Sequence, residues 1–137
     1  MDITICESAD ELGRRAAEAG ATHIRHTLAE QGRAVITLAA GRSQIGMLEH
    51  LIHAPDIDWS KVIAFPLDEY VGLSVKHPSS FRRYLLERFV NVLPTPLGAF
   101  HHIDGKAKDP STEAVRVSRL IREESLDVSF IGIGENG

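Results

Sequence analysis

The chain has 137 residues, of which 43% are hydrophobic and 25% charged, a composition typical of one globular domain. A formal net charge of -4 with interspersed acids and bases argues against a nucleic-acid partner, and the single cysteine, Cys6, excludes an internal disulfide. The N-terminal residues lack the pattern of a signal peptide, and no stretch approaches the ~20 apolar residues of a membrane helix. We therefore expect a cytoplasmic protein without a membrane partner.

The N-terminal region predicts a short strand followed by a long helix. Ile3 to Cys6 is a β-prone run. Ser8 and Glu11 have the Ser-x-x-Glu spacing of a helix start, so the helix should begin near Ala9. Small and apolar residues then recur every helical turn, which predicts an amphipathic helix that stops near Gly32.

Two buried strands frame a second helix. Residues 34–38 (AVITL) and 61–65 (KVIAF) read as strands of a sheet that is covered on both faces. Between them, Ser43 is the expected N-cap of a helix that ends before Pro55. Strand, helix and strand in this order make a βαβ unit, which predicts an α/β fold with a mostly parallel sheet.

The remaining elements extend the same pattern. Pro78 to Ser80 should open a third helix, residues 91–98 should break it, and residues 112–124 form a fourth helix. The final run, residues 127–134, reads as a buried strand with a Gly-rich turn after it. We expect residues 1–137 to be a single α/β domain, a truncated form that corresponds to the N-terminal half of a longer one.

Three loops follow strands and are the candidate site: residues 39–44, 66–74 and 132–137. In a parallel sheet they should line one crevice. The first offers the backbone N–H groups of Gly41, Arg42 and Ser43 at a helix N-terminus, which suits a phosphate. Glycine and serine used only for turn geometry and capping are the alternative interpretation.

The second loop places two carboxylates, Asp68 and Glu69, directly after a buried strand. A carboxylate partly withdrawn from water can act as a base on a proton next to a carbonyl, whereas a solvated surface turn is the alternative. The chain also has seven histidines, but no carboxylate or cysteine ligand is placed with them, so we expect no metal site.

The residues Asp68-Glu-Tyr-Val-Gly-Leu73, followed by His77-Pro-x-Ser80, resemble the signature of glucosamine-6-phosphate deaminases. Residues 38–44 (LAAGRSQ) and 130–137 (FIGIGENG) resemble two further loops of that family. Ala40 stands where the family commonly has threonine, and Asn136 stands where many members have aspartate.

This resemblance implies a Rossmann-like fold of the sugar-phosphate isomerase type and the conversion of an amino-sugar phosphate into a ketose phosphate and ammonia, without a cofactor. Asp68 would be the catalytic base, and Gly41, Arg42 and Ser43 would bind the substrate phosphate. Glu69, Tyr70 and Asn136 are candidates for supporting positions. The family's ring-opening histidine and later site residues are not found in the chain, which is therefore expected to be inactive alone.

Two alternatives stay open. A 6-phosphogluconolactonase-like hydrolase would share the fold, although its loop typically has Asp-Glu-Arg and then Val-Pro where this chain has Tyr70 and Gly72. A non-catalytic sugar-phosphate-binding module would keep the pocket without turnover. In each case the partner is a small sugar phosphate, and family members often form homo-oligomers.

Overall fold

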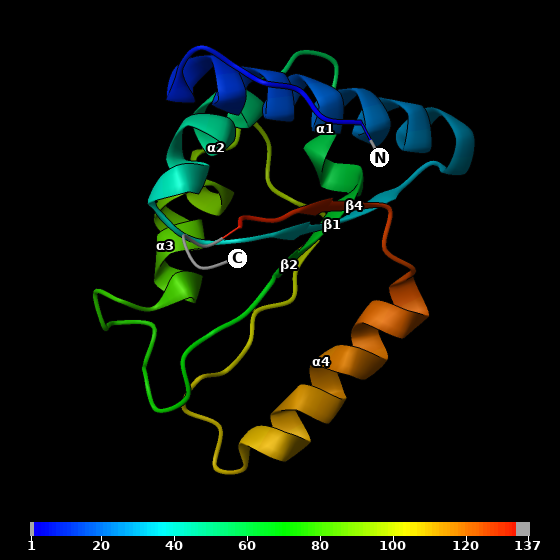
Figure 1. The fold of residues 1–137 in the computed structure, drawn as a ribbon. Helices are drawn as coiled ribbons and strands as arrows, with labels where there is room; N and C mark the ends of the chain where they lie inside the picture. The colour runs from blue at the N-terminus through cyan, green and yellow to red at the C-terminus, as the bar shows by residue number, and fades with distance from the viewer. Residues whose placement is uncertain (1, 134–137) are drawn as a thin grey trace.

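The computed structural model describes residues 2–133, which form a parallel sheet with helices on both faces (Figure 1). The strand order is β3-β2-β1-β4, and each neighbouring pair is parallel. This arrangement confirms the predicted α/β fold. The strands are β1 (Ala34–Leu38), β2 (Val62–Pro66), β3 (Ala99–Phe100) and β4 (Val128–Phe130).

Four α-helices flank the sheet: α1 (Ala9–Gln31), α2 (Ile45–Ile52), α3 (Phe81–Arg88) and α4 (Pro110–Glu124). Short 3₁₀ turns occur at Arg42–Gln44, Trp59–Lys61 and Val90–Val92. Successive side chains of a strand point to opposite faces of the sheet. The buried hydrophobic residues therefore form two clusters, one on each face. Ile36 packs with residues of α1, α2 and α3, whereas Val35 packs with Phe65 and with Val117 of α4.

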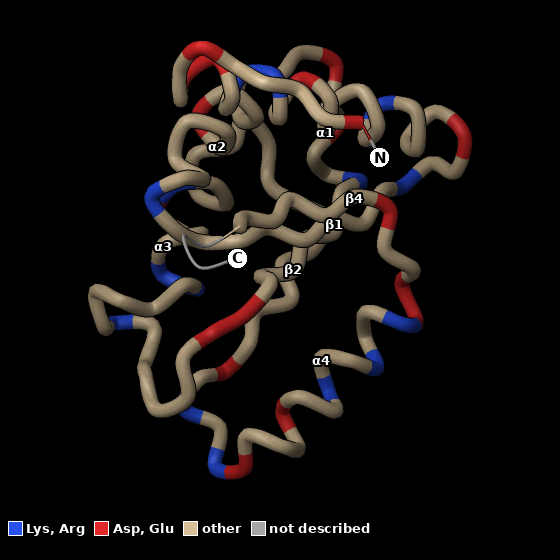
Figure 2. Tube along the Cα trace, viewed as in Figure 1, with Lys and Arg blue, Asp and Glu red and all other residues tan. Residues whose placement is uncertain are grey.

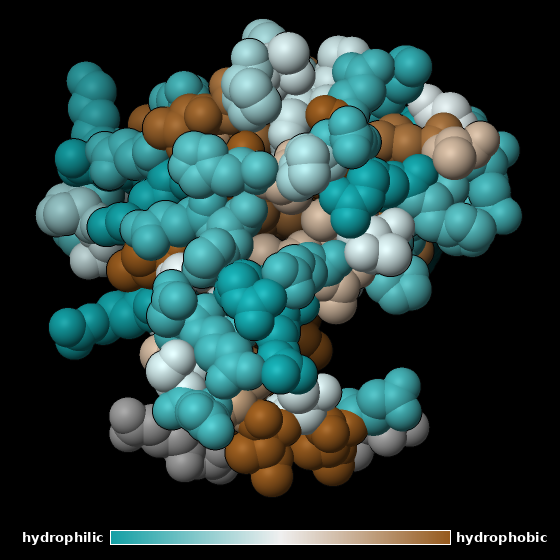
Figure 3. Space-filling model, turned by 90° about the horizontal axis from the view of Figure 1, so that it is seen from above, coloured by the Kyte–Doolittle hydropathy of each residue, from teal (hydrophilic) through white to brown (hydrophobic). Residues whose placement is uncertain are grey.

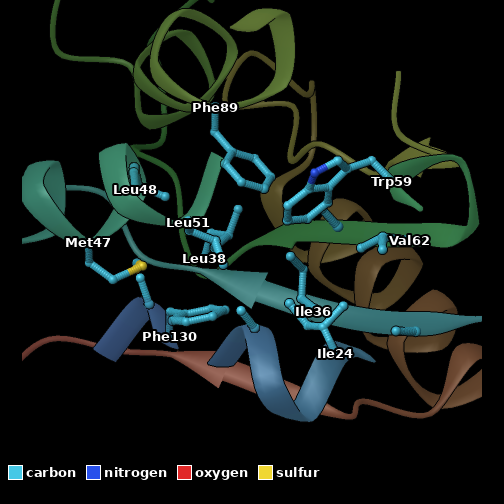
Figure 4. Close-up of a cluster of buried hydrophobic side chains, with 14 of the residues drawn as sticks. Ile24, Ile36, Leu38, Met47, Leu48, Leu51, Trp59, Val62, Phe89 and Phe130 are labelled. Atoms are coloured by element: carbon cyan, nitrogen blue, oxygen red, sulfur yellow. The ribbon is translucent and has the colours of Figure 1, made fainter. Parts of the chain in front are cut away.

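The larger cluster lies on the side of α1, α2 and α3 (Figure 4). Trp59 and Phe89 are fully buried there and meet edge to face, with ring centroids 5.4 Å apart. Their burial places both aromatic rings in the core. On the surface, the face seen over α1 is largely hydrophilic, with separate apolar areas between the polar side chains (Figure 3).

Several predicted boundaries are confirmed by the caps that define them. The Ser8 side chain accepts a hydrogen bond from the Glu11 N–H at 3.1 Å, and α1 begins at Ala9. Gly32 ends α1 with a φ of 75°, in the left-handed region that glycine enters without a steric penalty. Ser80 caps α3 by accepting from the Arg83 N–H.

Other expectations were wrong. Residues 3–6 form no strand, and Ile3 and Ile5 are 78% and 91% exposed, because this segment pairs with no other strand. Ser43 caps no helix, since it lies inside the 3₁₀ turn that precedes α2, and Gly41 takes the N-cap position without a side-chain bond. The sequence reading also missed β3, which is two residues long and too short to show a pattern.

The predicted last strand is shorter than expected, at Val128–Phe130, and residues 134–137 lie outside the described part of the chain. The fourth helix begins at Pro110, two residues before the predicted Thr112, because Asp109 caps it. Across residues 2–133, no helix combines the length and the apolar character that crossing a membrane requires.

Candidate active site

The ends of β2, β1 and β4 bring the three predicted loops to one edge of the sheet. The Leu67 N–H donates to the Leu38 carbonyl at 2.9 Å, and the Ala39 N–H donates to the Phe130 carbonyl at 3.0 Å. The first loop therefore runs between the other two. This confirms the shared edge for the described residues, but Asn136 lies outside them.

The first and third loops approach each other closely at a glycine. A Cβ atom added at Gly132 would lie 3.1 Å from Nε2 of Gln44 and 3.6 Å from Oγ of Ser43. Glycine at this position lets the loop after β4 lie against the Ser43 side of the first loop. A larger residue would have to displace the Gln44 side chain, which is buried.

Gly41 gives the first loop its shape. Its φ of 134° is a conformation that residues with a side chain rarely adopt. The Gly41 carbonyl accepts two hydrogen bonds, from the Gln44 N–H at 3.1 Å and from the Tyr84 hydroxyl at 2.8 Å. The next two residues, Arg42 and Ser43, are exposed at the start of the 3₁₀ turn, where N–H groups have no intrahelical acceptor. The geometry thus fits an anion-binding loop.

The second loop puts an acidic segment directly after β2, as the charge pattern shows (Figure 2). Asp68 is exposed, and within residues 2–133 its carboxylate accepts no hydrogen bond. Partial burial raises the pKa of the Asp68 carboxyl above its ordinary value, and the adjacent Glu69 carboxylate raises it further. Asp68 is thus a carboxylate that is free to accept a proton.

Glu69 has a different environment from its neighbour. Its carboxylate accepts hydrogen bonds from the Ser80 hydroxyl at 2.7 Å, the Arg82 N–H at 2.9 Å and the Phe81 N–H at 3.0 Å. A fourth comes from the Tyr70 N–H at 2.8 Å. Burial alone would raise the pKa of the Glu69 carboxyl, but these bonds outweigh it and lower the pKa. Glu69 therefore holds the N-terminus of α3.

A second anchor fixes the far side of the same loop. Gly72, with a φ of 90°, donates its N–H to the Gly105 carbonyl at 2.7 Å. A Cβ atom added at Gly105 would lie 2.5 Å from the Tyr70 carbonyl oxygen, so the two loops touch through their backbones. The Tyr70 ring is about half exposed and packs on Phe81, with centroids 4.7 Å apart.

Sequence reasoning missed Tyr84 and Gly105 as residues that shape the site. The available signal for Tyr84 is its residue type, because the hydroxyl of a partly buried tyrosine usually finds a hydrogen-bond partner. Gly105 lies in a segment without a motif, and no local pattern indicates which backbone it approaches.

A cavity of about 370 Å³ lies between the second loop and α4. Asp68 and Glu69 line it on one side, and Glu113, Val117 and Ile121 of α4 line it on the other. Hydrogen bonds from Arg116 lower the pKa of the Glu113 carboxyl to about 2, so Glu113 is ionised at neutral pH. None of Gly41, Arg42 and Ser43 lines the cavity; the first and second loops share an edge without sharing this space.

The histidines are not gathered into a metal-binding group. Over the described residues, no three side chains of the His, Cys, Asp and Glu types lie together in a way that could hold a metal ion. His50 instead contacts Asp10, with its Nε2 atom 3.1 Å from the carboxylate. This bond links α2 to α1.

The sequence and the structure are similar to known sugar-phosphate enzymes. A glucosamine-6-phosphate deaminase from Exiguobacterium sp. is 33% identical over 137 residues, which cover 100% of this chain and 51% of that protein. A solved glucosamine-6-phosphate deaminase, described as monomeric, is similar with a TM-score of 0.89 and 29% identity over 100% of this chain and 57% of its own.

A 6-phosphogluconolactonase from Shewanella baltica shares the fold, with a TM-score of 0.83 at 18% identity over 96% of this chain and 56% of its own. The chain spans about half the length of the curated relatives it matches. The sequence pattern of one family matches residues 7–137. The chain therefore belongs to the family of glucosamine-6-phosphate isomerases and 6-phosphogluconolactonases.

Proposed function

We propose that this chain carries the phosphate-binding loop and the catalytic base of a glucosamine-6-phosphate deaminase. The observation that carries the proposal is the difference between the environments of the two adjacent carboxylates, Asp68 and Glu69. Glu69 is occupied by four hydrogen bonds, whereas Asp68 accepts none within residues 2–133 and has a raised pKa. A base that removes a proton from carbon needs a carboxylate that is not occupied by hydrogen bonds and that has a raised pKa.

In the proposed reaction, the N–H groups at Arg42 and Ser43 hold the phosphate of the sugar. The carboxylate of Asp68 removes the proton from C2 of the ring-opened aldose and returns it at C1, through an enolamine intermediate. Addition of water at C2 then releases ammonia and leaves a ketose phosphate, fructose 6-phosphate. The products contain the atoms of glucosamine 6-phosphate and one water, so no oxidant or reductant is required.

The deaminase relatives and the second loop support this reaction over lactone hydrolysis. Tyr70 and Gly72 occupy positions where lactonases typically have other residues, and both contribute to the loop's geometry. Gly72 has a φ of 90° and donates to Gly105, while the Tyr70 ring packs on Phe81. The likeness to the Shewanella lactonase, at 18% identity, supports the fold alone.

A sugar-phosphate-binding module is the second candidate. It is favoured by Ala40, which stands where the family commonly has threonine and offers no hydroxyl to a substrate. Such a module would use the same loop of Gly41, Arg42 and Ser43 but would release no ammonia. Self-association stays a prediction, and a solved relative is described as monomeric.

Binding can be tested by following the backbone N–H signals of Arg42 and Ser43 in NMR titrations. We expect glucosamine 6-phosphate to shift these signals saturably and glucosamine to leave them nearly unchanged, because the N–H groups would contact the phosphate. Equal responses to both sugars would contradict the proposal. An assay for released ammonia then separates the deaminase from the binding module.

A further inference from the structure

One helix contacts both functional loops. At its N-terminus, α3 donates the N–H groups of Phe81 and Arg82 to Glu69, the neighbour of Asp68. About one turn later, the Tyr84 hydroxyl of the same helix donates to the Gly41 carbonyl at 2.8 Å. The first turn of α3 therefore connects the loop after β1 with the loop after β2.

From this connection we propose that Tyr84 is a positioning residue for phosphate binding, which acts by fixing the orientation of the Gly41–Arg42 peptide. The inference rests on the proposed function, because it takes the loop after β1 as the phosphate-binding loop. It goes further by assigning the orientation of that loop to a side chain outside it, on α3.

The geometry of the peptide bond explains how Tyr84 would act. A trans peptide is planar, and its C=O and N–H groups point in opposite directions. When the Tyr84 hydroxyl holds the Gly41 carbonyl towards α3, the N–H of Arg42 must point away from α3. The orientation of the carbonyl thus sets the direction of the first N–H group in the proposed cradle.

Glycine makes such an anchor necessary. Gly41 has a φ of 134° and a ψ of 167°, and a Cβ atom there would meet nothing within 4 Å. Glycine has no side chain that could restrain the backbone by packing, and it can adopt many other conformations at little cost. The hydrogen bonds from the Gln44 N–H and the Tyr84 hydroxyl to the Gly41 carbonyl restrain the orientation of this peptide.

Tyr84 is well suited to hold a fixed direction. Its side chain is half-buried on α3, and the guanidinium of Arg88 lies 5.5 Å from the centre of its ring. Leu85, the next residue, is fully buried and anchors the helix in the core. The hydroxyl is thus carried by a rigid element, in contrast to the glycine loop that it contacts.

Tyr84→Phe tests the inference, because it removes the hydroxyl and keeps the ring. Arg88→Ala is the matched control, since it removes the cation over the ring and leaves the hydroxyl bond in place. The first measurement is hydrogen exchange by NMR at the Gln44 N–H, which shares the Gly41 carbonyl with Tyr84. The N–H groups of Ala39 and Leu67 serve as internal references, because their acceptors are Phe130 and Leu38.

For Tyr84→Phe we expect exchange at Gln44 to accelerate roughly three- to tenfold, the range for loss of one hydrogen bond, with the references unchanged. We expect the dissociation constant for glucosamine 6-phosphate to rise by a similar factor and that for glucosamine to stay the same. Arg88→Ala should change neither quantity. A merely structural role of the hydroxyl would alter stability but not this difference between the two sugars.

The outcomes separate the inference from the proposed function. If wild type binds both sugars equally, the proposed function fails, and the role of Tyr84 in phosphate binding fails with it. If wild type prefers the phosphorylated sugar but Tyr84→Phe binds it equally well, the inference is overturned and the proposed function stands. Unchanged exchange at Gln44 in Tyr84→Phe would overturn the orienting role whatever the wild type binds.

Discussion

The loops after β1 and β2 lie side by side at the sheet edge but offer opposite chemistry. The first presents backbone N–H groups around Gly41, and the second presents the carboxylate of Asp68. Both are tied to α3, through the Tyr84 hydroxyl in one case and the Glu69 carboxylate in the other. In each loop, the atom that bonds to the region of α3, the Gly41 carbonyl oxygen or a Glu69 carboxylate oxygen, differs from the group that we propose meets the substrate.

Replacing the free carboxylate should have the largest effect. In a fusion of this chain with the remainder of the Exiguobacterium deaminase, we expect Asp68→Asn to slow deuterium exchange at C2 of glucosamine 6-phosphate by about 10²- to 10⁴-fold, the usual contribution of a general base. Binding should be retained, because asparagine has nearly the same shape. Exchange at the unsubstituted rate would remove Asp68 from the mechanism.

Removing the anchored carboxylate should instead affect folding. Glu69→Ala leaves the N–H groups of Phe81 and Arg82 without their acceptor, and we expect a loss of about 2–3 kcal/mol in the free energy of unfolding. Urea denaturation measures this loss. Glu87→Ala is the control, because its exposed pair with Arg83 should contribute under about 0.5 kcal/mol. Equal losses in the two variants would contradict the anchoring role.

The second anchor can be broken through the backbone contact at Gly105. A Cβ atom there would lie 2.5 Å from the Tyr70 carbonyl oxygen, so Gly105→Ala should displace the Asp68 loop and cost about 1–2 kcal/mol. Gly46→Ala is the matched control, since nothing lies within 4 Å of its Cβ position and alanine favours the helix. Thermal unfolding that ranks the two variants in the opposite order would refute the close contact.

The smallest expected change is on the phosphate side. Ser43 is exposed, and its hydroxyl accepts a long, 3.4 Å hydrogen bond from Nε2 of Gln44. Ser43→Ala should therefore weaken binding of glucosamine 6-phosphate by roughly two- to tenfold, with little effect on glucosamine. Isothermal titration of both sugars measures this. A proportional loss for both would indicate that Ser43 contacts the sugar ring and not the phosphate.

Sequence patterns predicted the elements that rest on local signals. Residues that are neighbours in the sequence determine three such features: the buried strand β1, the cap at Ser80 and the helix end at Gly32. The N-terminal run at Ile3 shows the limit, because β propensity forms no strand without a partner to pair with. The cap predicted at Ser43 failed for a related reason, since a 3₁₀ turn before α2 moved the helix start beyond it.

For the candidate site, the local residue pattern identified both carboxylates, and only the family resemblance assigned them different roles. The separation depends on Ser80, Phe81 and Arg82, which reach Glu69 only because α3 folds back against the second loop. The contact between Tyr84 and Gly41 likewise joins residues that lie far apart in the chain. Such long-range contacts have no local pattern, so they emerge only from the folded structure.

The different pKa values of the two carboxyls also predict opposite effects of pH on stability. The raised pKa of Asp68 means that its ionisation opposes folding: this cost is absent below its unfolded pKa and complete above its folded pKa. The lowered pKa of Glu69 means that its ionisation favours folding: this gain is present above its unfolded pKa and is lost as the pH falls through its folded pKa.

The most direct test of the different roles of Asp68 and Glu69 is the titration of their side-chain carboxyls by ¹³C NMR in the intact chain. The account predicts that the pKa of Asp68 lies above the ordinary aspartate value and that of Glu69 lies below the ordinary glutamate value. In Glu69→Gln, the pKa of Asp68 should fall, because its charged neighbour is gone. A lowered pKa for Asp68 together with a raised one for Glu69 would contradict the assignment of Asp68 as the base.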